Sequence, residues 1–493
     1  MPPMATSSPT HSPAKPFLAA FASALVPGIG QFIAGDKRKG TILLAIDVAV
    51  LAALVMMFHD EVSIAKAWIK PSSLALMMIG NILFLGFRIW AADDAYHTVK
   101  GRQTNATGAS RAAMLVFGSA IVAILVVPHV AFGYIDVVQY DLITSVFDSP
   151  SPTTTVVADP GTSSPPSTDA TGATVPTTDP ATTTTSANVP AIWNGLDRLN
   201  ILLIGGDFGE GRTGIRTDTM ITVSIDPVTG EAAMFSVPRN WTGAPLPEGM
   251  GVWDCDCYPE LINELWIMGE RYPENFPGPG SPSENAVKGV ISEFLGIPIH
   301  YYAMVNLDGF VDVVDALGGV EVYVPTRVVD EEYPSEDGQG TERIVIEPGL
   351  NQFDGHLALA YARTRHQDSD YFRMSRQRCV IEAMVDQADP VSLLTNFAGL
   401  AGVIKDSMTT DIPLDALPQL VELKPVLDLE NIVSVRFIPP EYHLKFRDDG
   451  KPGRIADTEL VHEHVQLVIN DPERAIVELG LENLEEVCGE PGT

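Results

Sequence analysis

Basic residues are scarce in this chain of 493 residues, which contains 31 Lys and Arg against 63 Asp and Glu. The deficit is uneven along the chain. Residues 1–147 hold ten basic and eight acidic residues, which leaves 21 basic and 55 acidic residues in the remainder, a net charge of −34. Binding to nucleic acid through its phosphate backbone needs a broadly positive surface. The composition therefore argues against nucleic acid as a partner.

Several short motifs of nucleotide and metal sites are also missing. The sequence contains no GxxxxGK[ST] phosphate loop, no HExxH and no CxxC. The stretch His462–His464 (HEH) lacks the zinc spacing, so we interpret it as a surface feature. No cleavable signal peptide is evident at the N-terminus.

Cysteine is rare as well, and none of the four cysteines lies in residues 1–147. This distribution fits disulfides in an oxidising compartment. Cys255 and Cys257 lie too close for a comfortable mutual bridge. We therefore predict that each pairs elsewhere, with Cys379 and Cys488 as partners and the connectivity open. A metal site is the alternative, although the CxxC spacing is absent.

Long apolar runs are concentrated before residue 135. Thr41–Phe58, Ser72–Trp90 and Ala112–Tyr134 each contain about 18–23 residues, enough to cross a bilayer as helices, and they barely show a polar face. Phe17–Ala34 is apolar but broken by prolyl, glycyl and glutaminyl residues, so whether it crosses stays open. We predict that residues 1–147 form a membrane region with three or four transmembrane helices.

The loops between these runs predict an orientation. Lys37, Arg38 and Lys39 precede the second run, and basic residues at 100, 102 and 111 separate the third from the fourth. Basic loops stay on the cytoplasmic side, so everything after Tyr134 is expected outside.

The segment that follows is almost entirely Ser, Thr, Pro, Ala and Gly from Ser149 to Val189. Such a composition cannot bury a core. We therefore predict a disordered linker over residues 148–190, which lets a tethered domain stand off from the bilayer.

Regular patterning resumes at Leu199. Apolar runs typical of strands alternate with helical patterns, which predicts an α/β domain with a central sheet covered by helices. The expected strands are residues 200–206, 216–226, 232–237, 301–305 and 320–324, and the expected helices are residues 261–269, 284–295 and 307–317. We assign residues 191–390 to this α/β domain. Residues 391–493, with an expected strand at 432–437 and helix at 460–470, are its C-terminal completion or extension.

A glycine-rich loop, Gly205–Gly214, joins the first two strands and carries charged residues at its ends. Asp207, Arg216 and Asp218 are the residue types that a magnesium–pyrophosphate site needs. Magnesium takes one or two protein carboxylates and completes its shell with water and phosphate oxygens, and arginines neutralise charge on a leaving phosphate. On spacing alone, the two carboxylates are also typical of loop caps and turns.

A second charged stretch, Tyr361–Arg378 (YARTRHQDSDYFRMSRQR), contains five arginines. Asp370, Arg373 and Gln377 fall on one face of a helix. Arg363 and Arg365, two residues apart, would point the same way at an extended strand end. Guanidinium groups fixed on one patch suit phosphate oxygens. A solvated face with surface ion pairs is the alternative.

Four stretches, in order along the chain, resemble the LytR-CpsA-Psr family. They are GGDFGEGRTGIRTDTMITVSIDPVTGEAAMFSVPRN, INELW, FLGIPIHYYAMVNLDGFVDVVDALGGVEVYVP and IEPGLNQFDGHLALAYARTRHQDSDYFRMSRQR, and the resemblance covers Leu199 to Asp386. Two residues depart from the family's pattern. Asn240 stands where an aspartate is usual, and Leu261 stands where a lysine is common.

The resemblance implies an α/β/α sandwich whose apolar cavity holds a lipid chain. Apolar positions of residues 307–317 are candidates for its wall, and ordinary core packing is the favoured alternative for each of them. It implies a magnesium-dependent phosphotransferase, anchored in the bacterial cell membrane with its catalytic domain outside. Such a protein moves a glycopolymer from a polyprenyl-pyrophosphate carrier to peptidoglycan through a phosphodiester bond. Carried over to this sequence, the magnesium ligands are Asp207 and Asp218, the pyrophosphate-binding residues are Arg216, Arg239, Arg363 and Arg365, and the remaining polar site residues are Asp370, Arg373 and Gln377.

In the implied reaction, a sugar hydroxyl of the wall attacks the phosphorus proximal to the glycan and releases polyprenyl phosphate. Asp218 and Asp370 are the candidates for a general base. Two other hypotheses share the binding step: a non-catalytic binder of polyprenyl phosphates, and a pyrophosphatase that hydrolyses the lipid-linked intermediate. The glycan and the acceptor stay open, since teichoic acid, capsule and arabinogalactan linkages all use this family.

Overall fold

The structure is a computed structural model of the chain, and it separates into a helical unit before residue 147 and an α/β unit after it. The predicted linker 148–190 lies outside the described residues. Those residues are 15–57, 59, 61–101, 111–147, 196–207, 214–251, 253, 255–335, 340–364, 370–387, 407–423, 426–427, 431–447, 450, 453–481 and 488.

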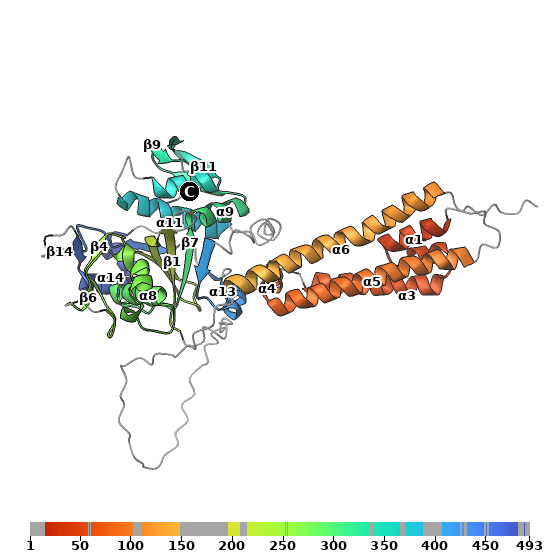
Figure 1. The fold of residues 1–493 in the computed structure, drawn as a ribbon, viewed down its shortest axis with the longest axis horizontal. Coiled ribbons are helices and arrows are strands. Elements are labelled where there is room, and N and C mark those ends of the chain that lie inside the picture. The colour runs from red at the N-terminus through yellow and green to blue at the C-terminus, as the bar shows by residue number, and fades with distance from the viewer. Residues whose placement is uncertain are drawn as a thin grey trace, which may run out of the picture. The chain divides into compact units, whose positions relative to one another are not determined.

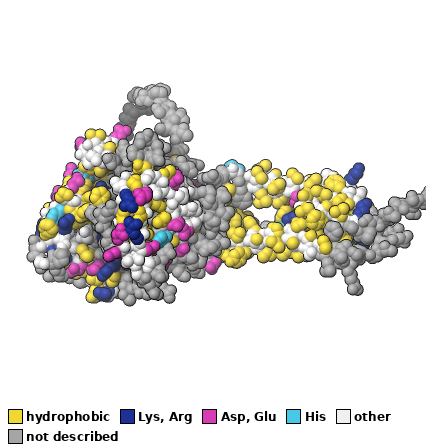
Figure 2. Space-filling view, turned by 90° about the horizontal axis from the view of Figure 1, so that it is seen from above, with side chains coloured by type: hydrophobic (Ala, Val, Ile, Leu, Met, Phe, Trp, Pro, Cys, Tyr) yellow, Lys and Arg dark blue, Asp and Glu magenta, His cyan; other side chains and the backbone are white. Residues whose placement is uncertain are grey.

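The helical unit confirms the helices expected from the long apolar runs. Among its described residues, three helices are long and apolar enough to cross a membrane, with spans at Lys37–Met56, Pro71–Gly101 and Gly118–Ser145. Apolar side chains dominate the surface of this unit in Figure 2. Its helices are α1 (Lys15–Leu25), α2 (Ile29–Ile33), α3 (Lys37–Met57), α4 (Glu61–Ile69), α5 (Pro71–Gly101) and α6 (Arg111–Phe147).

The interrupted segment at residues 17–34 folds as the two short helices α1 and α2. Its 11-residue helix α1 is about 16 Å long, whereas the hydrocarbon core of a bilayer is about 30 Å thick. Gly28 separates the helices with a φ of 105°, a conformation that favours glycine. Gln31 is fully buried and donates hydrogen bonds to the Ala91 carbonyl at 2.9 Å and to Asp94 at 3.1 Å. Gln31, which interrupts the apolar run, therefore links α2 to α5 by hydrogen bonds. Helix α1 alone is too short to cross a bilayer.

The α/β unit is organised on a six-stranded mixed sheet with the order β12-β7-β1-β2-β3-β13. β1 pairs in parallel with β7, and β3 with β13, while the other neighbours are antiparallel. Its strands are β1 (Leu199–Asp207), β2 (Arg216–Ile225), β3 (Ala232–Ser236), β7 (Tyr301–Asn306), β12 (Met408–Thr410) and β13 (Val433–Arg436). The expected strand at 320–324 forms as β8, but it pairs with β11 (Gly349–Phe353) in a separate two-stranded sheet.

Helices cover both faces of this sheet, which confirms the expected α/β/α sandwich (Figure 1). One apolar core joins the sheet to α7 (Leu265–Arg271), α8 (Pro282–Leu295), α14 (Thr458–Asn470) and α15 (Pro472–Leu479). The other core joins the opposite face to α9 (Leu307–Ala316), α10 (Gly355–Arg363) and α11 (Asp370–Gln387).

Shorter elements complete the unit. A small sheet joins β4 (Trp241–Thr242) to the pair β14 (His443–Phe446) and β15 (Arg454–Ala456). The other elements are β5 (Ala244–Pro245), β6 (Cys257–Tyr258), β9 (Val328–Pro334), β10 (Thr341–Ile346), α13 (Leu417–Leu423) and the 3-10 turns Ile262–Glu264, Pro273–Asn275 and Leu414–Ala416.

The predicted disulfide pairing is wrong. Cys255 bonds to Cys257, and Cys379 on α11 bonds to Cys488. The chain bends at residues 255 and 256, which brings the two Cα atoms to 5.0 Å, inside the range of about 4.4–6.8 Å that disulfides require. Cys379 and Cys488 are both buried in the core shared with α11, far from the bend in sequence.

Candidate active site

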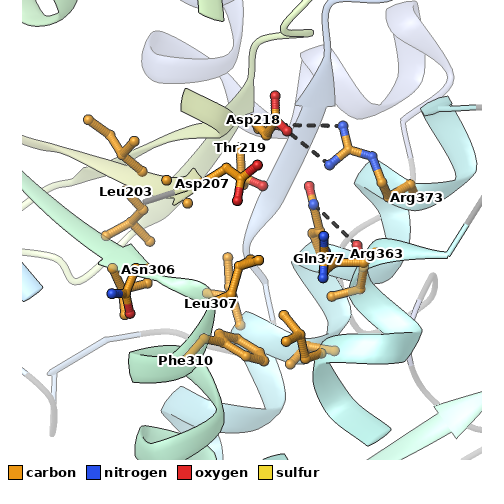
Figure 3. A pocket seen from close by; sticks show the side chains of 18 of the residues that line it. Leu203, Asp207, Asp218, Thr219, Asn306, Leu307, Phe310, Arg363, Arg373 and Gln377 are labelled. Atoms are coloured by element: carbon orange, nitrogen blue, oxygen red, sulfur yellow. Dashed lines mark hydrogen bonds between the residues drawn. The ribbon is translucent and has the colours of Figure 1, made fainter. Parts of the chain in front are cut away.

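A cavity of about 510 Å³ opens between the sheet and the helices α9, α10 and α11. Figure 3 shows charged side chains gathered at one end of it and apolar side chains at the other. Its lining includes six of the nine site residues expected from the sequence: Asp207, Asp218, Arg239, Arg363, Arg373 and Gln377.

Helix α11 contributes a stripe, a row of side chains that is polar at one end of the cavity and apolar at the other. Arg373 and Gln377 line its first part, while Val380, Ile381 and Met384 line its later part. These positions are three or four residues apart, so they share one helix face. The stripe reaches about 16 Å from Arg373 to Met384, at about 1.5 Å per residue. The first turns of α11 also bring the positive end of the helix dipole to the charged end of the cavity.

The two predicted metal ligands come together through an irregularity in the β1–β2 pairing. Gly205 pairs with Thr219 and Gly206 pairs with Thr217, so Asp218 is the extra residue of a β-bulge. A bulge changes the direction of side chains, so residues that strict alternation would place on opposite faces of the sheet can point to the same side. Asp207, Asp218 and Thr219 consequently all line the cavity.

Asp218 is held by partners on three sides. Its Oδ2 accepts from Arg239 at 2.9 Å, and its Oδ1 accepts from the amide of Asn263 at 3.0 Å. Both terminal nitrogens of Arg373 donate to the Asp218 carbonyl oxygen at 3.4 Å. Asn263 belongs to the INELW stretch, which the sequence analysis noted for its resemblance without assigning this residue a role.

The carboxylates at this end fit a magnesium ion that also binds a substrate. Magnesium is usually held by one or two carboxylates plus substrate phosphates and water, rather than by a cage of protein ligands. Asp207 and Asp218 supply that number of carboxylates on one cavity wall. Within the described part of the chain, no group of three or more His, Cys, Asp or Glu side chains forms a closed metal site.

The arginine-rich stretch divides into two roles. Arg363 and Arg373 line the cavity, whereas Arg376 and Arg378 are buried beneath it. Arg376 donates to the carbonyl oxygens of Tyr361, at 2.7 Å, and Thr364, and so fixes the chain where α10 ends. Arg378 donates to Ser434, and burial together with the nearby Arg436 lowers its pKa to about 9. Arg365 lies outside the described residues.

The expectation of an extended strand end at Arg363 is wrong, because Arg363 is the last residue of helix α10. Asp354 caps that helix by accepting from the amide of Leu357 at 2.8 Å, and capping favours helix formation over extension. The guanidinium of Arg363 lies 6.0 Å from the ring centroid of Tyr333, on β9. Burial raises the pKa of the Tyr333 hydroxyl, and Arg363 partly offsets that rise.

Strand β9 supplies site residues that the sequence analysis missed. Asp330, Glu332 and Tyr333 line the cavity, and the Asp330 carboxylate accepts from the hydroxyl of Thr364. Asp330 and Glu332 alternate along the strand, but nothing local showed that this strand would lie against the stretch around Arg363.

The remaining predicted residues occupy different places. Gln377 is buried and donates to the Ala362 carbonyl at 3.2 Å, so it also fixes the end of α10. Asp370 begins α11, and its side chain lies outside the described residues. Arg216 is exposed, outside the cavity lining, and lies 3.9 Å from Glu264. Asn240, where the family usually has an aspartate, is exposed and outside the lining as well.

The helix expected at residues 307–317 contributes Leu307, Phe310 and Val313 of α9 to the apolar end of the cavity. The apolar lining also includes Leu203, Ala303, Val305, Met384, Val385 and Met408. That this wall holds a lipid chain stays a prediction.

The histidines of the HEH stretch are engaged in packing. His462 Nε2 lies 2.8 Å from the Glu293 carbonyl oxygen, and His464 Nδ1 lies 2.8 Å from the hydroxyl of Tyr442.

The fold is an α/β/α sandwich whose cavity is charged at one end and apolar at the other. The sequence model of the LytR_cpsA_psr family matches residues 167–444, more than half of the chain, and the protein therefore belongs to this family.

Curated relatives carry the name polyisoprenyl-teichoic acid–peptidoglycan teichoic acid transferase TagU. The protein from Halalkalibacterium halodurans is 30% identical over 226 residues, which cover 45% of this chain and 64% of the relative. The protein from Oceanobacillus iheyensis is 33% identical over 227 residues, which cover 46% of this chain and 62% of the relative. The chain thus spans less than two thirds of these relatives' length.

Solved structures show weaker similarity. The crystal structure of Bacillus subtilis TagV is 23% identical, has a TM-score of 0.42, and is matched over 56% of this chain and 98% of that one. The structure of TagT bound to LIIa-WTA is 20% identical and has a TM-score of 0.39. The match covers 58% of this chain and 92% of that one.

Proposed function

We propose that this protein is a magnesium-dependent phosphotransferase that moves a glycopolymer from a polyprenyl-pyrophosphate carrier to peptidoglycan through a phosphodiester bond. The observation that carries the proposal is the continuous stripe of α11, which joins Arg373 and Gln377 at one end of the cavity to apolar side chains at the other. A ligand that fits this gradient has a charged head and a hydrocarbon tail, as the carrier has.

The charged end would bind the pyrophosphate. Arg239, Arg363 and Arg373 come from three separate elements, so they can contact different oxygens of one pyrophosphate group. Hydrogen bonds between guanidinium and phosphate are charge-assisted and often bidentate. Magnesium bound by Asp207 and Asp218 supplies further positive charge to the phosphate oxygens. The apolar end, with Phe310 and Met384, would hold the first part of the prenyl chain.

The proposed reaction exchanges one phosphate ester for another. The oxygen of a peptidoglycan hydroxyl forms a bond to the phosphorus proximal to the glycan, and the bond from that phosphorus to the bridging oxygen breaks. Polyprenyl phosphate leaves with the bridging oxygen and its electron pair, and the hydroxyl proton passes to a base. Asp218 is tied to Arg239 and Asn263, which suits a metal ligand better than a base. Asp370 is therefore the preferred candidate.

The helical unit supports a multi-pass protein of the bacterial cell membrane. Three helices are long and apolar enough to cross. The basic loops favour an orientation that puts the α/β unit on the extracytoplasmic side, where peptidoglycan lies. The relatives named as teichoic acid transferases support a wall glycopolymer as cargo.

A direct test uses the full chain in lipid nanodiscs with magnesium, a lipid-linked oligosaccharide and soluble peptidoglycan fragments. A product joined to peptidoglycan supports transfer. Release of free phosphorylated glycan would instead establish a pyrophosphatase, and ligand binding without turnover would establish a binder. Arg363→Ala is expected to abolish turnover without changing the melting temperature. Arg271→Ala, at an exposed arginine of α7, serves as the control that keeps wild-type turnover.

A further inference from the structure

A surface of aromatic, aliphatic and basic side chains lies beside the charged end of the cavity. We call it the hairpin surface, and its members come from the start of α11 and from the β14–β15 pair. Phe372, Leu444 and Phe446 expose 62%, 58% and 63% of their area. Exposed apolar side chains that gather in one patch, unlike single ones, mark interaction sites. The hairpin surface consists of Tyr371, Phe372, Leu444, Phe446 and Arg454.

Three side chains of this surface, Phe446, Arg454 and Tyr371, are connected to one another. Arg454 pairs with Phe446 across the two strands, and its guanidinium lies 5.8 Å from the centroid of the Phe446 ring. The same guanidinium donates to the hydroxyl of Tyr371 at 3.4 Å. The hairpin is therefore attached to α11 at the point where that helix enters the cavity.

Two connections fix the position of the surface relative to the site. On α11, Tyr371 and Phe372 directly precede Arg373, so they continue the helix beyond the charged end of the cavity. Arg454 also pairs with Trp241, two residues after the cavity residue Arg239. The apolar end of the cavity lies in the opposite direction along α11, at Met384. The hairpin surface therefore borders the end at which the phosphorus of the carrier would lie.

We infer that the hairpin surface binds the peptidoglycan acceptor and directs its hydroxyl to the charged end of the cavity; this inference rests on the proposed transferase function. Sugar rings present apolar C–H groups that pack on the negative faces of aromatic rings. The stem peptides of peptidoglycan carry carboxylates, which the guanidinium of Arg454 can bind.

A membrane surface fits the position less well than peptidoglycan does. The prenyl chain would leave the bilayer and enter the cavity at its apolar end, so the bilayer is expected at that end. The hairpin surface lies beyond the other end of the α11 stripe.

The hairpin surface lies partly outside the family match. The match ends at residue 444 and so includes Tyr371, Phe372 and Leu444, whereas Phe446 and the whole of β15 follow that position.

The experiment measures acceptor binding separately from transfer. The full chain in detergent is sedimented with purified peptidoglycan sacculi, as wild type and as the variants Phe446→Ala and Arg454→Ala. Each variant is expected to weaken co-sedimentation by about tenfold, the size of effect typical of a residue central to an interface. Val477→Ala, at an exposed apolar residue of α15, is the matched control and should bind like wild type.

Two further measurements distinguish a loss of acceptor binding from a loss of carrier binding or of the chemical step. Affinity for polyprenyl pyrophosphate should be unchanged in both variants, while the KM for soluble peptidoglycan fragments should rise and kcat should stay close to wild type. If both variants sediment with sacculi like wild type, the inference is wrong, whether or not the protein is a transferase. Suppose that sacculi binding depends on Phe446 but neither wild type nor any variant transfers glycan to peptidoglycan. The hairpin surface is then confirmed as a peptidoglycan-binding surface, and the proposed transferase reaction is wrong.

A label at position 444 tests the membrane alternative. Leu444→Cys, modified with a fluorophore in nanodiscs, should be quenched by peptidoglycan fragments and not by lipids that carry a quencher in their chains. Quenching by the lipids in the absence of peptidoglycan would overturn the inference in favour of membrane contact.

Discussion

The disulfide between Cys379 and Cys488 is expected to stabilise the α/β unit far more than the one between Cys255 and Cys257. The first joins residues 109 positions apart, and the second joins residues two positions apart. In the chain-entropy description, closing a loop of the first size removes about 5 kcal/mol of unfolded-state entropy, against less than about 2 kcal/mol for the second. The pair Cys379→Ala and Cys488→Ala should therefore be about 3 kcal/mol less stable than Cys255→Ala and Cys257→Ala.

Alanine is the appropriate replacement because both Cys379 and Cys488 are buried among apolar side chains, where a serine hydroxyl would add its own desolvation cost. The assay is urea unfolding of the full chain in detergent, followed by the fluorescence of the tryptophans in the α/β unit. Equal urea midpoints for the two double variants would show that the length of the closed loop does not determine the stabilisation. A greater loss of stability in the Cys255→Ala, Cys257→Ala variant would show the same.

Variants at three other positions have effects whose sign follows from the structure. Arg376→Ala removes the donor to two carbonyl oxygens at the end of α10 and should lower the free energy of unfolding by about 2–3 kcal/mol, measured by urea unfolding; no loss would show that the end of α10 is fixed by other contacts. Burial and the nearby Lys288 lower the pKa of His300 to about 4 from a usual 6.5, so the stability it contributes is complete above pH 6.5 and is lost as the pH falls toward 4. His300→Gln should flatten that part of the stability profile, and an unchanged slope would contradict the assignment. Phe310→Ala should weaken binding of a long-chain polyprenyl pyrophosphate while leaving binding of inorganic pyrophosphate unchanged, and equal losses for both ligands would place Phe310 outside the prenyl site.

The parts of the fold that were predictable are those that depend on local pattern. The apolar run at residues 200–206 and the alternation after residue 216 became β1 and β2, and the spacing of Arg373 and Gln377 placed both on the face of α11 that lines the cavity. The burial of Arg376 and Arg378 could not be predicted from helical spacing, because it depends on contacts with Tyr361, Thr364 and Ser434 on other elements.

Other features depend on contacts between distant parts of the chain. The bulge at Asp218 exists only in the register between β1 and β2, and a single strand does not reveal it. The pairing of Cys379 with Cys488 depends on where the C-terminal segment packs. The helical end at Arg363 did have a local signal, since Asp354 followed by apolar residues at helical spacing is typical of a helix start.

The proposed function requires that the charged end of the cavity bind pyrophosphate. This can be measured as the affinity of the full chain, with magnesium, for polyprenyl pyrophosphate and for polyprenyl monophosphate. We expect wild type and the Arg271→Ala control to prefer the pyrophosphate. Arg363→Ala combined with Arg373→Ala should reduce this preference by at least about a hundredfold, since each charge-assisted contact is worth about 1.5–3 kcal/mol. An unchanged preference in that double variant, with the fold intact, would show that these arginines do not bind the pyrophosphate.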